Sequence, residues 1–259
     1  MAGGPGTLRA RRRLLACLAL ASLAPGPRAL SSPPATPPIR WYAPALLEGK
    51  AFPVLRSGEQ WLNWRDTFGA PRMRLQPDGI WRQVGIHQGI DIFSEKGAPV
   101  ISMTPGEVEN AGWTFYSGWR VGIRDAGGDY YLYAHLSGPP AVSKGQAVKA
   151  GSVIGSLGSS GYGAEGTADE FPPHLHFGVK NASGWENPQG LLERLYENYV
   201  QATRGARERI ADLRRRERLL VARAHGTAAP PERTLGRAMD ALSAQRAQLE
   251  VELFFELDR

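Results

Sequence analysis

Residues 119–136 read WRVGIRDAGGDYYLYAHL, and this stretch indicates the fold of the central part of the chain. Two short runs rich in Val, Ile, Leu and Tyr flank the turn-forming residues Ala-Gly-Gly. Such runs, bounded by Gly and Asp, are typical of β-strands that are joined by turns. The stretch therefore predicts β-structure in this region.

Similar runs lie on both sides of this stretch. They are four to eight residues long, they end at Gly, Pro, Asp or Ser, and they fall at 99–103, 106–113, 152–157 and 174–180. No helix-length pattern separates them, so antiparallel sheets are favoured over alternating strands and helices. Residues 46–190 are therefore predicted to form a mainly β domain with antiparallel sheets that holds its own core.

The last part of the chain has a different pattern. Between residues 191 and 259, Gly and Pro are rare outside HGTAAPPE at 225–232, and apolar residues such as Leu192, Leu195 and Tyr199 recur at helical spacing. Basic and acidic residues are interleaved along this part, as on a solvated helical surface. We expect two helices over 191–259 that form an antiparallel hairpin, and we expect the β domain to fold without them.

The first residues have the pattern of an export signal. Residues 1–13 hold four arginines and no acid, and the apolar run Leu14–Ala24 follows. A basic start, a short apolar run and small residues after it are typical of a secretory signal peptide. The run is too short to cross a bilayer, which takes ~20 residues. Cleavage is expected after Ala24 or after Ser31, and we interpret residues 1–31 as the signal peptide.

Removal of this signal changes what the charge of the chain implies. The formal charge of the whole chain is +6; cleavage after Ala24 removes four arginines and leaves +2, and cleavage after Ser31 removes five and leaves +1. A nearly neutral mature chain has little electrostatic attraction for nucleic acid, so we expect no nucleic-acid partner. The mature chain is also expected to have no transmembrane segment, and the Pro-rich residues 32–45 are interpreted as a linker.

The chemistry of the chain is expected to depend on histidines and carboxylates. The one cysteine, Cys17, excludes an intrachain disulfide and any multi-cysteine metal site. In a strand, His174 and His176 project from the same face, and His87 and Asp91 are four residues apart. A hydrolytic zinc site takes three such ligands and keeps one position open. His87, Asp91 and one of the two paired histidines supply that set.

Two further histidines are then left for proton transfer. The chain has no H-E-x-x-H segment whose Glu could serve as the base. His135 and the paired histidine that does not bind metal are therefore candidates for the base and for the donor to the oxyanion. His135 lies in an alternating run, where we expect it on the same face as Tyr131 and Tyr133. His225 lies in the predicted hairpin turn and is assigned no role.

Four segments together resemble one known family. They are HQGIDIFSEKGAPVISMTPGEVENAG (87–112), YYLYAHLS (130–137), GQAVKAGSVIGSLGSSG (145–161) and PHLHFGV (173–179). In order and spacing they resemble the lysostaphin/LytM-type zinc metalloendopeptidases. The resemblance implies an antiparallel, two-sheet, β-sandwich-like peptidase domain at 46–190, followed by the C-terminal α-helical hairpin.

The resemblance also implies roles for the residues that match the family motifs. His87, Asp91 and His176 are expected to bind Zn²⁺, and His135 and His174 are expected to be the catalytic pair. Members of this family cut peptide bonds in the stems or cross-bridges of bacterial peptidoglycan. The expected substrate is therefore a peptidoglycan peptide, and the expected location is the cell envelope, either periplasmic or extracellular.

The chain departs from the family pattern at two places. Residues 158–173 form a longer segment before H-L-H than is usual, and this segment carries Glu165, Asp169 and Glu170. We expect it to be a solvated loop or a groove wall that selects substrate. Gly178 stands where many members have Glu. Neither change affects an expected zinc ligand, so both are expected to influence substrate preference.

A second function is compatible with the helical tail. Relatives that have lost their metal ligands act as non-catalytic scaffolds or activators of other cell-wall hydrolases, and they use a helical region to do so. The hairpin at 191–259 is accordingly expected to self-associate, to dock an envelope protein or to cover the active site. The complete set of expected ligands favours the enzyme over the scaffold.

Overall fold

A computed structural model describes residues 41–57, 62–224 and 232–255 of the chain. These residues belong to one compact unit. The predicted signal peptide at 1–31 lies outside the described residues, as do most of the predicted linker and His225.

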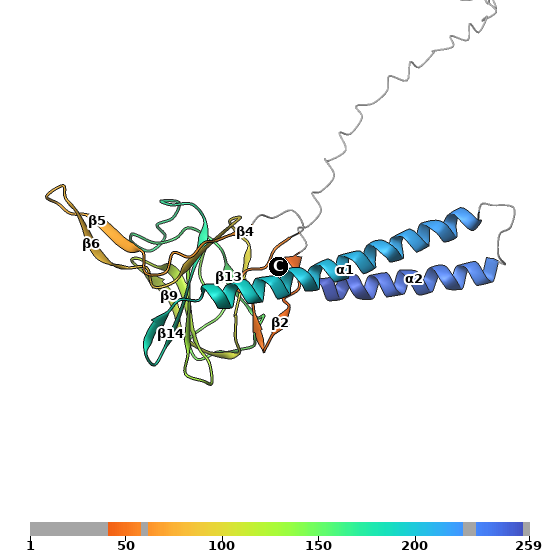
Figure 1. The fold of residues 1–259 in the computed structure, drawn as a ribbon, viewed down its shortest axis with the longest axis horizontal. Helices are drawn as coiled ribbons and strands as arrows, with labels where there is room; N and C mark the ends of the chain where they lie inside the picture. Colours follow the sequence, from red (N-terminus) through yellow and green to blue (C-terminus); the bar gives the residue numbers. More distant parts are fainter. Residues whose placement is uncertain (1–40, 58–61, 225–231, 256–259) are drawn as a thin grey trace, which may run out of the picture. The chain divides into compact units, whose positions relative to one another are not determined.

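The described residues form sixteen strands and two helices (Figure 1). The strands are β1 (Trp41–Tyr42), β2 (Leu46–Leu47), β3 (Lys50–Ala51), β4 (Leu62–Asn63), β5 (Pro71–Leu75), β6 (Trp81–Ile86), β7 (Ile90–Ser94), β8 (Pro99–Ile101), β9 (Gly106–Thr114), β10 (Gly118–Arg124), β11 (Tyr130–Leu136), β12 (Ala147–Val148), β13 (Val153–Ser156), β14 (His174–Asn181), β15 (Gly184–Glu186) and β16 (Phe254–Phe255). The helices are α1 (Gln189–Ala224) and α2 (Glu232–Leu253).

One large antiparallel sheet dominates the β region. Its strand order is β12-β9-β10-β11-β14-β7-β4, and β15 pairs with β14. The remaining strands form small antiparallel pairs, namely β8 with β13, β2 with β3, β5 with β6 and β1 with β16. The predicted mainly β, antiparallel architecture with a C-terminal helical hairpin is confirmed. The layer beside the large sheet contains the short pair β8–β13 rather than a second broad sheet.

The hydrophobic core lies on one face of the large sheet. Tyr131 and Tyr133 of β11 and Phe177 of β14 are fully buried there, together with Ile101 of β8. The buried hydroxyl of Tyr133 accepts a hydrogen bond from the backbone N–H of Met103 at 2.8 Å, which satisfies that polar group inside the core. The side chains on the opposite face of β11 and β14 are not part of this core.

The core continues from the sheet into α1. Pro188 occupies the first helical turn and the Asn187 side chain accepts the backbone N–H of Gln189, so the helix begins with a typical cap. Leu192, Leu195 and Tyr199 then follow at intervals that place them on one helix face, and all three are buried in the same core cluster as the sheet residues. The core of the β region is therefore continuous with α1, and independent folding of the β region stays a prediction.

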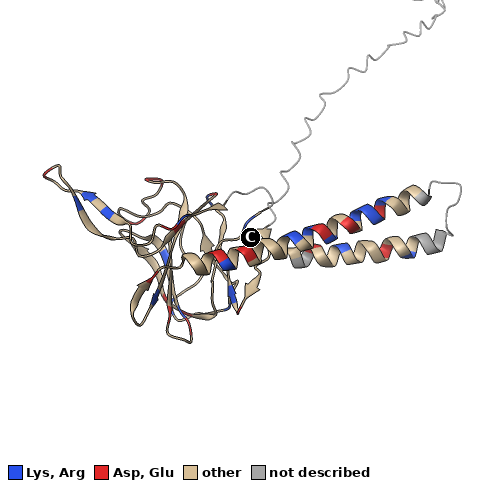
Figure 2. Ribbon diagram, in the orientation of Figure 1, with Lys and Arg blue, Asp and Glu red and all other residues tan. Residues whose placement is uncertain are grey.

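α2 runs back along α1, so the two helices form the predicted hairpin (Figure 1). Arg214 of α1 pairs with Glu250 of α2 at 2.8 Å, and Arg246 of α2 pairs with Glu217 of α1 at 3.2 Å. Basic and acidic residues are interleaved along α1 (Figure 2). No helix in the described part of the chain is long and apolar enough to cross a membrane.

The pair β5–β6 is an exposed arm. Every residue of β6 is exposed, including Trp81, Val84 and Ile86. The arm is attached to the rest of the molecule at its base, where Ala70 accepts the backbone N–H of His87 at 2.8 Å. This attachment brings β5 beside the histidines described below. The arm was not predicted from the sequence, because its apolar residues do not form a face that is buried in the core.

Candidate metal centre

The register of two neighbouring strands brings the first three site residues together. In the antiparallel pair β7–β14, Asp91 lies directly opposite His176. His87 lies in the turn between β6 and β7, four residues before Asp91. Its Nε2 atom is 3.0 Å from Asp91 Oδ1 and 2.9 Å from His176 Nδ1, and the latter two atoms are 3.0 Å apart. Three donor atoms thus converge at mutual distances of 2.9–3.0 Å.

Hydrogen bonds alone do not account for these three contacts. His87 Nδ1 lies 3.0 Å from the carbonyl oxygen of Thr67, which can only accept, so the ring hydrogen is on Nδ1 and a lone pair is on Nε2. Asp91 Oδ1 also carries lone pairs, so a neutral His176 offers at most one hydrogen for three close contacts. Three converging acceptor atoms are the arrangement that a bound cation stabilises.

The size and chemistry of this triad fit a zinc ion. A triangle with sides near 3.0 Å has its centre about 1.7 Å from each corner, so an ion at the usual ~2.0–2.1 Å from each ligand fits just off the plane. Two imidazole nitrogens and one carboxylate oxygen are also a ligand set that hydrolytic zinc sites use. In the described part of the chain, His87, Asp91 and His176 are the one group that meets these conditions.

The charge of Asp91 is strongly stabilised. Burial acts to raise the pKa of its carboxyl, but the neighbouring imidazoles, above all that of His176, hold it well below the usual value. Oδ2, the oxygen that faces away from the triad, is 3.4 Å from Nη2 of Arg72 on the β5–β6 arm. Asp91 is therefore an anion at every pH at which the protein is expected to work.

His135 and His174 lie beside the triad, and backbone groups hold both rings. Nδ1 of His135 is 2.7 Å from the carbonyl oxygen of Ser160, and Nδ1 of His174 is 2.8 Å from that of Pro172. Because a carbonyl only accepts, each Nδ1 carries the hydrogen and each Nε2 presents a lone pair. The two ring centroids are 4.9 Å apart, and His174 Nε2 is 3.7 Å from Asp91 Oδ1. The structure thus brings all five predicted site residues together.

The expectation that His135 shares a face with Tyr131 and Tyr133 is wrong. The pairing of β10 with β11 shifts register between Trp119 and Val121, which is a β-bulge, and His135 has a φ of 64°. A left-handed residue breaks the two-residue alternation of a strand. Tyr131 and Tyr133 consequently point into the core, whereas His135 turns outward to the face of His174.

Burial keeps these histidines neutral. Burial, with a smaller contribution from the nearby His174, lowers the pKa of His135 to about 3. Burial also lowers the pKa values of His174 and His176. Neutral imidazoles can bind a metal or accept a proton, so the three rings have the protonation state that either role requires.

The low pKa of His135 predicts a pH dependence of stability. Because its pKa is about 3 in the folded state and ~6.5 when unfolded, the unfolded chain binds the proton first, and stability falls as the pH drops below 6.5. Between pH 7 and pH 5 this residue alone is expected to cost the metal-free protein about 2 kcal/mol. In His135→Asn, the Asn side chain keeps a donor for the Ser160 carbonyl and tolerates the left-handed backbone. The free energy of unfolding of this variant should therefore fall by about 2 kcal/mol less between pH 7 and pH 5. Urea unfolding of both proteins at pH 7 and 5 measures the difference, and equal losses would contradict the assignment.

A cleft opens in front of the two outer histidines. It has a volume of about 680 Å³, and His135, His174, Asp91 and Arg72 line it. A smaller cavity of about 190 Å³ borders His87 and His176 and shares Arg72 and His135 with the cleft. The five site residues are therefore bordered by these two spaces.

The longer segment at 158–173 forms one wall of this cleft. Phe171 packs edge-on against His135 with ring centroids 4.8 Å apart, and Tyr162 stacks on His135 at 6.2 Å. Glu170 lines the cleft, whereas Asp169 is turned to Lys96 and pairs with it at 2.6 Å. The acidic residues of this segment were predicted to matter from the sequence. Tyr162, Phe171 and Arg72 were not, because their spacing carries no signal.

Gly178 leaves room for an aromatic side chain. A Cβ atom at this position would lie 2.7 Å from the carbonyl oxygen of Gln88 and 2.8 Å from the ring of Trp185. Trp185 packs against Tyr130 and Leu132 on the outward face of the sheet and lines the smaller cavity. The absence of Glu here is therefore tied to the position of Trp185.

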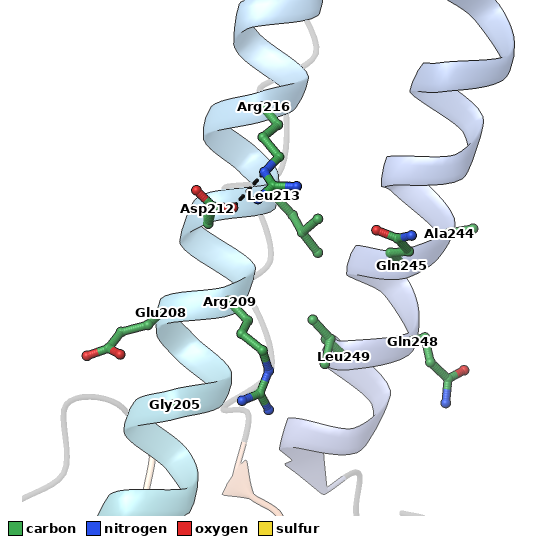
Figure 3. Close-up of a pocket in the computed structure, with 10 residues that line it drawn as sticks. All are labelled: Gly205, Glu208, Arg209, Asp212, Leu213, Arg216, Ala244, Gln245, Gln248 and Leu249. Carbon is green, nitrogen blue, oxygen red and sulfur yellow. Dashed lines mark ion pairs between the residues drawn. The ribbon is translucent and has the colours of Figure 1, made fainter.

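A further hollow lies between α1 and α2, away from the histidines (Figure 3). Its volume is about 930 Å³, and Leu213 and Leu249 face each other across it. Asp212 and Arg216 form an ion pair of 2.7 Å at its edge. None of the five site residues lines this space, so its size does not connect it with their chemistry.

Residues 85–188, which include all five site residues, match the model of Peptidase family M23. The chain carries a peptidase M23 domain. The predicted resemblance to lysostaphin/LytM-type endopeptidases is thereby confirmed.

Curated relatives of the M23 domain include peptidoglycan endopeptidases of different bond specificity. The L-Ala–D-Glu endopeptidase of Bacillus subtilis is 52% identical over 100 residues, which are 38% of this chain and 31% of the relative. Lysostaphin of Staphylococcus simulans is 36% identical over 121 residues, which are 46% and 22% of the two chains. The matches thus span less than a third of these relatives.

A solved structure similar to the M23 domain has been described from Ruminococcus gnavus. It is a putative glycyl-glycine endopeptidase lytM, 37% identical in sequence, with a TM-score of 0.46. The similarity covers 58% of this chain and 60% of the other.

Proposed function

We propose that this protein is a zinc-dependent endopeptidase that hydrolyses peptide bonds in bacterial peptidoglycan. The observation that carries the proposal is the convergence of His87, Asp91 and His176 with two further neutral histidines at one cleft. The M23 domain and relatives named as peptidoglycan endopeptidases support the substrate class.

In this proposal His87, Asp91 and His176 hold the zinc ion. When bound there, zinc supplies Lewis-acid chemistry, which polarises a carbonyl oxygen and eases the ionisation of water. Arg72 balances the second carboxylate oxygen of Asp91, and the Thr67 carbonyl fixes the tautomer of His87.

His135 and His174 are proposed to move protons during hydrolysis. Each ring offers Nε2 as a base, because its Nδ1 is held by a backbone carbonyl. One of them takes a proton from the attacking water. The protonated ring then donates this proton to the leaving amine. The other ring can stabilise the negative charge that develops on the former carbonyl oxygen once its Nε2 carries a proton. Phe171 packs against both rings and helps to hold them in place.

The proposed place of action is the periplasm or the outside of the cell. The basic residues and the apolar run at 1–31 support export, and peptidoglycan is found only beyond the cytoplasmic membrane. The hairpin of α1 and α2 is proposed to self-associate or to dock an envelope protein. A purely scaffolding role is less favoured, because it would not need three convergent ligands and two anchored bases.

Digestion of purified peptidoglycan tests this function. The protein is expected to release fragments with new amino and carboxyl groups, and a chelator should stop the release until zinc is restored. Mass spectrometry of the fragments identifies the bond that is cut. New reducing sugar ends without new amines would instead identify a glycosidase, and undiminished cleavage after complete metal removal would exclude the metallopeptidase.

A further inference from the structure

Arg72 occupies an unusual place for an arginine. It lies on β5 of the exposed arm, lines both the cleft and the smaller cavity, and its side chain is 43% exposed. Its guanidinium contacts Asp91 Oδ2 at 3.4 Å, which is at the long end of hydrogen-bonding distances. An arginine has five N–H donors, and among the described residues Asp91 is the one hydrogen-bond partner of Arg72. Most of its donors are therefore available at the junction of the two spaces.

The arm is held in position next to the cleft by a second arginine. Arg74, two residues further along β5, donates a hydrogen bond to the hydroxyl of Tyr116. Its guanidinium also lies over the Tyr116 ring, 4.9 Å from the centroid. Tyr116 belongs to the turn between β9 and β10 and lines the smaller cavity. The contact holds the strand that carries Arg72 against the turn between β9 and β10.

We propose that Arg72 binds a carboxylate of the substrate beside the scissile bond, so that the site selects acidic stem peptides over glycine cross-bridges. This inference rests on the proposed endopeptidase function and deepens it. Arginine recognises carboxylates through two parallel hydrogen bonds, which gives both affinity and orientation. A glycine cross-bridge has no side-chain carboxylate to offer.

The chemistry of the stem peptide fits this position. The D-Glu residue of a stem is linked through its side-chain carboxyl, so its α-carboxylate is free. In an L-Ala–D-Glu bond, this carboxylate is attached to the carbon that carries the scissile nitrogen, and it lies within about 4 Å of the reacting carbonyl carbon. Arg72, whose guanidinium touches the outer oxygen of a proposed metal ligand, is at a matching short distance from the reaction centre.

The remaining charge of the cleft limits where such a carboxylate can bind. Glu170 also lines the cleft and carries the opposite charge. The cleft as a whole is therefore not a general anion site, and a carboxylate is attracted to the part next to Arg72. An amino group on the following residue of the stem would suit the part next to Glu170.

Three substrates and two variants of the full chain test the proposal. The substrates are a stem peptide that contains L-Ala–D-Glu, the same peptide with the D-Glu α-carboxylate converted to an amide, and pentaglycine. Wild-type protein is expected to cleave the first with a kcat/KM about 10–100-fold above the second, and pentaglycine least. Arg72→Gln should reduce this preference to within about threefold, because cleavage of the acidic peptide slows much more than cleavage of the other two substrates. Arg82→Gln is the matched control, since Arg82 is an arm residue that pairs with Asp78, and it should keep the wild-type preference.

A binding measurement separates recognition from an effect on the metal. Calorimetry with the product peptide that begins with D-Glu should show weaker binding to Arg72→Gln than to wild type, and no such difference for the amidated product. Equal losses on acidic and amidated peptides, together with a lower zinc content, would show that Arg72 acts only through Asp91 and would overturn the proposal. Wild-type cleavage without preference, or of pentaglycine alone, would overturn it while leaving the endopeptidase function intact. Failure of wild-type protein to cut any of the three peptides would overturn the proposed function and this assignment with it.

Discussion

Replacing His176 by alanine is expected to lower kcat/KM for peptidoglycan hydrolysis by at least ~10³-fold, because residues of a catalytic unit act together. The change removes one of three donor atoms that lie within 3.0 Å of one another, and it leaves a pair that holds a cation poorly. His176 is on the outward face of β14, opposite Asp91, so its loss should leave the core intact. Dye release from labelled peptidoglycan measures the effect, and thermal unfolding checks that the variant is folded.

His225→Ala is the control for this experiment. His225 lies outside the described residues and was assigned no role from the sequence, so this variant should keep wild-type activity. If His176→Ala also kept full activity in a folded protein, the proposed ligand set would be wrong. If His176→Ala were active while His135→Asn and His174→Ala were inactive, the assignment of the two bases would stand. The metal ligands would then have to be sought among other residues.

Deleting residues 191–259 is expected to prevent folding. The deletion removes Leu192, Leu195 and Tyr199 from the core that they share with the sheet. Each large apolar side chain that leaves a core costs ~2–5 kcal/mol, so three of them cost more than about 6 kcal/mol. That loss is comparable to the whole stability of a typical domain, ~5–15 kcal/mol. Circular dichroism of the truncated protein should show no cooperative thermal transition.

A shorter hairpin is the matched control for the truncation. Glu217 of α1 lies 3.2 Å from Ser243 of α2, so a short glycine-serine turn can join these two positions and replace residues 218–242. This version keeps the buried start of α1, the end of α2 and the following strand β16, which pairs with β1. It should unfold cooperatively near the wild-type temperature. A truncated protein that unfolds as cooperatively as this control would show that the β region is self-sufficient after all.

The sequence predicted the parts of the fold and site that depend on local pattern. The runs DYYLYAHL and HLHFGVK predicted strands because Tyr, Phe and Val favour strands, and helical spacing after residue 190 follows from a stripe that packs on a partner. The candidate ligands were found because strand geometry puts His174 and His176 on one face and because His87, Asp91 and His176 match a family motif. Their roles stay a proposal, as does the domain boundary near residue 190.

The features that the sequence did not predict depend on tertiary contacts. The outward turn of His135 requires a β-bulge and a left-handed backbone, and neither has a signal in Tyr-Ala-His-Leu. Arg72 approaches Asp91 only because the arm β5–β6 attaches beside the site. Helical spacing indicated that α1 buries one stripe, but it could not say that the stripe completes the core of the sheet.

The zinc content of purified full-length protein tests the central claim most directly. Inductively coupled plasma mass spectrometry of the wild-type chain and of Asp91→Ala, both after gel filtration, is the measurement. The account predicts one zinc per wild-type chain and almost none in the variant, because the Asp91 oxygen is 3.0 Å from both histidine nitrogens and completes the triad. An active wild-type protein without metal, or full zinc retention in Asp91→Ala, would contradict it.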